Sequence, residues 1–214
     1  MDKPMRVLLD NDPCPISPAS IGEALLAASD IAEGQGRLVI EVLVDGQPLT
    51  DNDLQEEDRL SKSAEEVQLK TTTVTHLLSE TFANAAAAIH DAHTVHEQAA
   101  DLIGSGKSIE GMQALSAALS MWGEIHEAVV KGLALAGEDP DSVAVGEVQL
   151  TKASSSLQQI LADLKNGISI QDNSSICDCL LYEFPPVSAQ WITLLEGLSK
   201  RYDSMINESN DSEL

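Results

Sequence analysis

The stretch HEQAADLIGSGKSIEGMQALSAALSMW, residues 96–122, governs the fold of most of this chain. At its centre, Gly104-Ser105-Gly106 separates two long segments in which apolar and small side chains recur at alternating spacings of four and three. Such spacing is typical of a helix face that packs on other helices. The positions are Leu78, Phe82, Ala85, Ile89, Ala92, His96, Ala99 and Ile103 before the joint and Met112, Leu115, Leu119, Trp122, His126, Val129, Leu133 and Ala136 after it. We therefore predict two long antiparallel helices that reverse at the joint.

Two further helices are predicted, because a hairpin this long cannot bury both of its sides alone. The third begins at Leu150 and ends at Asn166-Gly167. The fourth begins near Asp172, and we expect it to kink or break at Pro185-Pro186, since proline interrupts a helix interior. Residues 73–206 are thus predicted to form an antiparallel up-and-down four-helix bundle, and residues 207–214 a disordered acidic tail.

Residues 1–72 predict a small separate α/β domain. Its expected elements are a strand at 5–10 ended by the prolines of 11–15, a helix with the capping-box residues Ser20 and Glu23, a hairpin at 38–49 around Asp45-Gly46, and a strand at 67–71. Residues 50–64 are polar and acidic, and we expect a loop or a single helical turn there. One helix against about four strands suggests a β-grasp-like arrangement, so the fold class is α+β.

The charge of the chain limits its partners. Twelve Lys and Arg stand against 35 Asp and Glu, a formal net charge of −23, which repels phosphate backbones and anionic lipid. We therefore expect neither nucleic acid nor membrane as a partner, and leave open a basic protein partner or simple solubility. Three cysteines, an odd number, fit a reducing cytoplasm, as does the lack of a signal peptide or of about 20 consecutive apolar residues.

The histidines are the strongest candidates for chemistry, because all five lie between residues 76 and 126. His90, His93 and Glu97 share one helix face, and His126 lies only roughly 6 Å from His90 along the axis of the predicted hairpin. An alternative prediction is therefore that these four residues bind a metal ion. The competing interpretation is solvated flank histidines together with two core histidines, His96 and His126, that have hydrogen-bond partners.

Other catalytic signals are weak. There is no Gly-x-Ser-x-Gly motif, and no Ser or Cys has a His and an Asp near it in the sequence. Cys177 and Cys179 are one residue apart, a poor spacing for zinc, and we expect them to be small packing residues. We predict no cofactor and no enzymatic activity. Catalytic residues from distant segments leave no local motif, so an enzyme with a site between the domains stays a third hypothesis.

The leading functional hypothesis is a non-enzymatic interaction protein, adaptor- or chaperone-like, that binds a partner protein or a second copy through its helical bundle. The long apolar seams, the proline-interrupted last helix and the acidic surface motivate it. Acidic helical chaperones and adaptors of bacterial secretion or motility have this general character, which is an analogy of class and not of motif. The alternative is a helical bundle that binds a metal or small ligand through its His-rich first helix.

Overall fold

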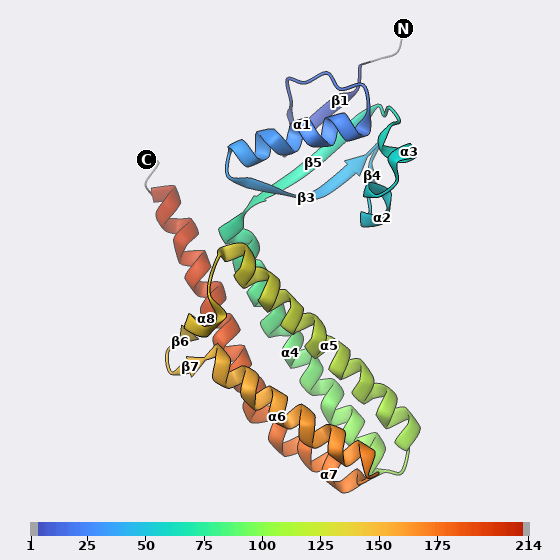
Figure 1. The fold of residues 1–214 in the computed structure, drawn as a ribbon, viewed down its shortest axis with the longest axis vertical. Coiled ribbons are helices and arrows are strands. Elements are labelled where there is room, and N and C mark those ends of the chain that lie inside the picture. The colour runs from blue at the N-terminus through green and yellow to red at the C-terminus, as the bar shows by residue number, and fades with distance from the viewer. Residues whose placement is uncertain (1–3, 212–214) are drawn as a thin grey trace. The chain divides into compact units, whose positions relative to one another are not determined.

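A computed structural model describes residues 4–211 of the chain, which is of mixed α and β structure with a small N-terminal sheet and a helical C-terminal region (Figure 1). It divides into two compact units with a boundary between Leu77 and Leu78.

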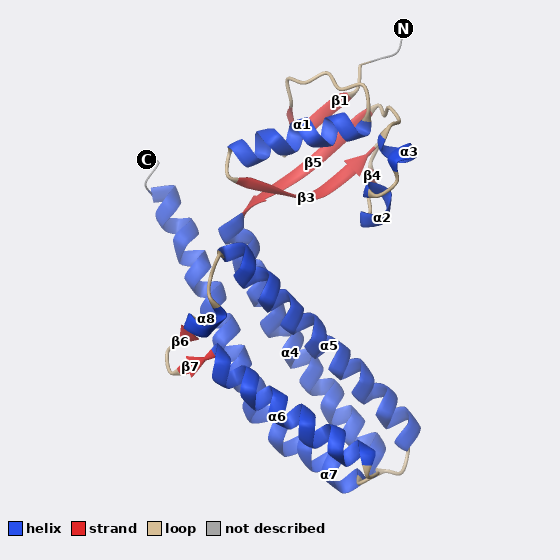
Figure 2. Ribbon diagram, viewed as in Figure 1, coloured by secondary structure: helices blue, strands red, loops and turns tan. Residues whose placement is uncertain are grey.

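The N-terminal unit is one helix packed on a five-stranded sheet (Figure 2). The strands are β1 (Arg6–Leu9), β2 (Asp12–Pro13), β3 (Arg37–Val44), β4 (Gln47–Pro48) and β5 (Glu66–Thr73), in the spatial order β2-β1-β5-β3-β4. β1 and β5 are parallel, with Val7 level with Val67, and all other neighbours are antiparallel. The helix α1 (Ile21–Gly34) buries Ile21 and three alanines, at positions 24, 28 and 32, against the apolar face of β1 and β5. Small side chains at this four-residue spacing let the helix approach the sheet closely.

The predicted start of α1 is confirmed at Ser20, whose hydroxyl accepts a hydrogen bond from the Glu23 backbone N–H. The Glu23 carboxylate accepts a hydrogen bond from the Ala19 backbone N–H. In a capping box it would accept from the N–H of Ser20, one residue later. The predicted hairpin at Asp45-Gly46 is also present, with Val44 paired to Gln47.

Two predictions for this unit need correction. Asp12 and Pro13 were expected to end a strand, but the chain turns through Asp10 and Asn11, both with positive φ, and forms the edge strand β2. Proline is acceptable there because an edge strand does not need every N–H for the sheet. Residues 50–64 hold two short helices, α2 (Asp51–Leu54) and α3 (Glu57–Leu60), instead of one turn at most.

The helical region consists of helices that lie side by side. They are α4 (Val74–Gly104), α5 (Ser108–Ala136), α6 (Leu150–Ser169), α7 (Asn173–Asp178) and α8 (Phe184–Asp211). The chain reverses between α4 and α5 as predicted, with Gly106 at φ 82°. The α5–α6 connection contains a 3₁₀ turn (Pro140–Ser142) and a small hairpin of β6 (Ala144–Val145) and β7 (Val148–Gln149), which the sequence analysis did not predict.

The predicted seam of α4 is confirmed at every position, since all eight residues are buried. The seam of α5 is confirmed only in part. Leu115, Trp122, Val129 and Leu133 are buried, but His126 is exposed, and Gly111, Ala118, Ile125 and Gly132 are buried where no seam was predicted. The buried face of α5 differs from the predicted one because it includes glycines. A Cβ on Gly111 would lie 3.1 Å from the Ala99 carbonyl oxygen, so this part of α5 approaches the α4 backbone directly.

Of the predicted kink or break at Pro185-Pro186, a break with a loop is not found, and the irregularity of the helix lies directly before the prolines. A π-helical segment, Cys179–Glu183, joins α7 to α8 without a loop, and the Phe184 N–H donates to the Cys179 carbonyl five residues back. The two prolines follow immediately, in the first turn of α8. The change from α- to π-type hydrogen bonding directly before them is the irregularity at which the helix accommodates two residues that lack an N–H. At the other end, α8 continues to Asp211, so residues 207–211 of the predicted tail are helical, and residues 212–214 lie outside the described part of the chain.

Candidate functional site

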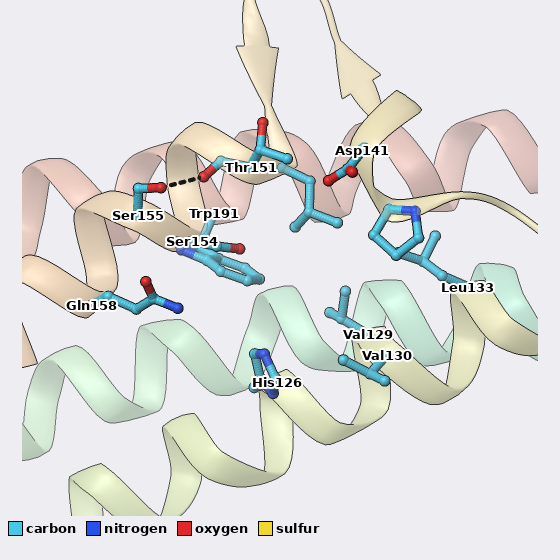
Figure 3. Close-up of a pocket in the computed structure, with 12 residues that line it drawn as sticks. His126, Val129, Val130, Leu133, Asp141, Thr151, Ser154, Ser155, Gln158 and Trp191 are labelled. Carbon is cyan, nitrogen blue, oxygen red and sulfur yellow. Dashed lines mark hydrogen bonds between the residues drawn. The ribbon is translucent and has the colours of Figure 1, made fainter.

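The most distinctive concave surface of the helical region is a groove between α5 and α6, with the indole of Trp191 from α8 as its floor (Figure 3). It consists of two adjoining hollows of about 320 and 410 Å³ that share His126, Ser154, Gln158 and Trp191. The first is completed by Val129, Val130, Leu133, Pro140, Asp141, Leu150, Thr151 and Ser155, and the second by Leu119, Trp122, Gly123, Leu157 and Leu161. We call this surface the α5–α6 groove.

The floor of the α5–α6 groove is held in place by a hydrogen bond and by ring packing. The Trp191 indole N–H donates to the Ala153 carbonyl of α6 at 3.2 Å. Its ring meets the Trp122 ring edge to face, with centroids 6.1 Å apart and planes at 78°. Trp122 in turn packs on Phe184 of α8, 6.1 Å away. Aromatic pairs in this geometry are stabilising beyond the apolar area they bury, so the two indoles, both almost completely buried, tie α5, α6 and α8 together beneath the groove.

The polar groups of the groove are few and come from opposite walls. Figure 3 shows His126 on the α5 side facing Ser154 and Gln158 on the α6 side, with Trp191 between the two helices. Asp141 lines the end next to the α5–α6 connection. Within residues 4–211, no hydrogen bond joins His126 to Ser154 or Asp141, so the pairing that activates a nucleophile is not present.

Gly123 is the unusual residue of the groove. It lies in the middle of α5, and a Cβ added to it would meet no atom within 4 Å. The glycines at 111, 132, 167 and 197 are different, because each faces a side chain that a Cβ would approach to between 2.2 and 3.2 Å. Glycine inside a helix costs about 1 kcal/mol relative to alanine. Packing within this chain therefore explains those four glycines and leaves Gly123 unexplained.

Several buried polar atoms of the helical region have no hydrogen-bond partner among residues 4–211. His96 of α4 is fully buried with its ring 4.3 Å from the Phe184 ring, and neither of its nitrogens has a hydrogen-bond partner. Burial, with a smaller contribution from His93, lowers the pKa of His96 to about 4, so the imidazole is neutral at pH 7. The Trp122 indole N–H and the Ser188 hydroxyl also lack partners. His96 was correctly predicted to be in the core, but the expected hydrogen-bond partner is not there.

Of the four residues of the predicted metal site, the structure places His93 and Glu97 together and His90 and His126 in different hollows. His90 is exposed and lines a different hollow, between α4 and α8, with Glu196 and Lys200. His93 Nε2 lies 3.6 Å from Glu97 Oε1, and His126 lies in the α5–α6 groove. Within the described residues, no three His, Cys, Asp or Glu side chains are arranged to hold a metal ion.

The cysteines of α7 and the π segment are packing residues. Cys179 is buried, and its burial, followed by the nearby Glu183 and Asp163 carboxylates, raises the pKa of the thiol to about 12. Cys177 Sγ lies 3.4 Å from the Ala100 carbonyl, and burial raises its pKa as well. Both groups are thiols at neutral pH, and a thiol is a poor nucleophile and a poor metal ligand.

Sequence reasoning missed the groove although it placed some of its residues. Trp122 was predicted only as a seam residue of the second helix, and Ser154, Gln158 and Asp141 carried no signal. Gly123 did carry one, because a glycine in the middle of a long helix lowers its stability and calls for a packing or functional reason.

No family model, curated protein or solved structure matches this chain. Among the helices of residues 4–211, none combines the length and the apolar character needed to cross a membrane. The chemistry of the α5–α6 groove therefore carries the functional argument.

Proposed function

We propose that this chain is a non-enzymatic protein-interaction module, adaptor- or chaperone-like, that binds a partner protein through the α5–α6 groove. In this proposal the helical region acts as an up-and-down bundle of four helices, with α7 and α8 as one member. The N-terminal unit is a β-grasp-like domain, a proposal that the parallel pairing of β1 with β5 at the centre of its sheet supports. Three free cysteines support a site of action in a reducing compartment such as the cytoplasm.

The observation that carries the proposal is the coincidence of Gly123 with a tryptophan floor. Tryptophan and small residues are useful at protein interfaces for different reasons: the ring supplies apolar area, and the missing side chain lets a partner approach the backbone. Gly123 has no role in the packing of its own chain, and it opens directly onto the groove. A partner that fills this space would explain why the helix retains a destabilising residue there.

The test is affinity capture from the source cell with three versions of the full chain. Gly123→Leu projects a side chain into the groove, and since the Cβ meets open space the fold is retained. Ala117→Leu adds a leucine to an exposed position of α5 that lines neither hollow of the groove, and is the matched control. We expect the wild type and Ala117→Leu to capture the same partner and Gly123→Leu to lose it.

Two results would count against the proposal. Equal capture by Gly123→Leu would remove the groove as the binding surface. No reproducible partner for any version, together with a monomer by light scattering, would remove the interaction function itself.

A further inference from the structure

We propose that the groove's occupant is an amphipathic helix of another protein, with basic residues beside its apolar face and one bulky apolar side chain above Gly123. This inference rests on the proposed function, and it specifies the shape and charge of the partner. The shape of the groove, the space at Gly123 and the charge of the walls support it independently.

The walls of the groove favour a helix over an extended peptide. Both walls are α-helices, whose backbone N–H and C=O groups are already bonded within the helix. Along the described helical walls, α5 and α6, an extended segment would find no strand edge to pair with, so its own backbone groups would lack partners there. A helix satisfies its backbone internally. The groove extends from Leu119 to Leu133 along α5, roughly 21 Å at 1.5 Å per residue, which is the length of about four helical turns.

The middle of the groove is shaped for one large side chain. Gly123 on one wall and Ser154 on the other are small, and Trp122 and Trp191 lie below them. A leucine or phenylalanine from the occupant would fill the open space at Gly123, above the buried rings of Trp122 and Trp191. Such an anchor, buried at the centre of an interface, carries a large share of the binding energy.

The charge of the walls selects a basic occupant. Asp141 is the acidic side chain among the described residues that line the groove, and residues 108–169, which include both walls and their connection, contain eight acidic and three basic side chains in all. Glu138 is paired with Arg201 of α8, whereas Asp141 lines the groove. A second copy of this chain has a net charge of −23 and would be repelled, so the occupant is a different protein.

The chain contains its own reporter for this experiment. Its two tryptophans are Trp122 and Trp191, so all of its intrinsic tryptophan emission comes from residues that line the groove. The probes are three 18-residue peptides without tryptophan. The first is an amphipathic helix of Leu, Phe and Lys, the second has Glu in place of Lys, and the third has the composition of the first in an order without an apolar face.

We expect the Lys peptide to change the emission of the full chain saturably, with a dissociation constant in the micromolar range. Gly123→Leu should weaken this binding about tenfold or more, and Ala117→Leu less than about twofold. Asp141→Asn should weaken it about two- to fivefold at low salt, and this difference should disappear at high salt because ions screen the interaction. Asp91→Asn, at an exposed position of α4, is the control for a general loss of charge.

Each other outcome identifies the part of the inference that is wrong. Equal binding of the Glu peptide overturns the charge preference, and equal binding of the third peptide, or unchanged binding by Gly123→Leu, overturns the docked helix. If Gly123→Leu no longer captures the partner but no peptide binds the wild type, the proposed function is supported and the inference of a basic amphipathic helix is wrong. A dimer of the wild type that Gly123→Leu dissociates would identify a second copy as the occupant and overturn it as well.

Discussion

Among single residues, His96 should make the stability of the protein depend on pH, because its imidazole is buried in the core. Burial lowers its pKa from 6.5 to about 4, so the unfolded chain binds a proton at a higher pH than the folded chain does. The unfolded state therefore holds more protons between these two values, and the free energy of unfolding must fall as the pH decreases from about 6.5 to about 4. We expect His96 to contribute a loss of about 2 kcal/mol at pH 5, measured by urea denaturation at pH 7.5 and pH 5.0.

His96→Leu is the control for this titration, since many carboxylates also titrate below pH 5. Leucine has a similar volume and no polar atom, so at pH 7.5 the variant should be at least as stable as the wild type, whose two imidazole nitrogens lack partners. Its stability should fall less than that of the wild type at pH 5. Parallel pH profiles for the two proteins would show that His96 does not titrate as its burial requires.

Within the helix α5, replacing glycine by alanine should change the free energy of unfolding in opposite directions at two positions. Gly111→Ala places a Cβ 2.5 Å from Ile103 Cγ1 and 3.1 Å from the Ala99 carbonyl oxygen, and the backbone cannot easily move away. We expect it to lower the free energy of unfolding by about 2–4 kcal/mol. Gly123→Ala meets no atom and should raise it by up to about 1 kcal/mol, because alanine is the better helix former. Chemical denaturation of the wild type and both variants measures these changes in the free energy of unfolding. A loss of stability at Gly123 would show that its packing, and not a partner, explains the residue.

For the molecule as a whole, the division at Leu77 predicts that the N-terminal unit folds alone. Its core is built from its own residues, with α1 against β1 and β5. A fragment of residues 1–77 should give a dispersed amide NMR spectrum and a cooperative thermal transition by circular dichroism. A spectrum with the narrow dispersion of an unfolded chain would show that this unit needs the helical region in order to fold.

The net charge of −23 also acts on the whole molecule. Repulsion among like charges destabilises the compact state, and salt screens it. Raising the sodium chloride concentration from about 0.05 to 0.5 M should therefore raise the free energy of unfolding, by about 1 kcal/mol. Urea denaturation at the two concentrations measures the effect. A decrease with salt would mean that attractive ion pairs outweigh the repulsion.

What could be predicted from the sequence follows from local chemistry. The α4 seam, the reversal after Gly104 and the turn at Asp45-Gly46 depend on periodicity and on turn residues, which neighbouring positions in the chain specify. The α+β composition follows in the same way. These features need no knowledge of what lies opposite each element.

The tertiary structure alone decided which side of each element faces a neighbour. α5 turns a glycine toward α4, so its buried face differs from the predicted one and His126 lies at the surface. The π segment before Pro185, which keeps the last helix continuous, was likewise not visible as a local pattern. The α5–α6 groove needs α5, α6 and Trp191 of α8 together, and contacts between residues this far apart in the chain have no local signature. Gly123 is the groove residue that the sequence itself marks as unusual, because a glycine in the middle of a long helix lowers the stability of that helix.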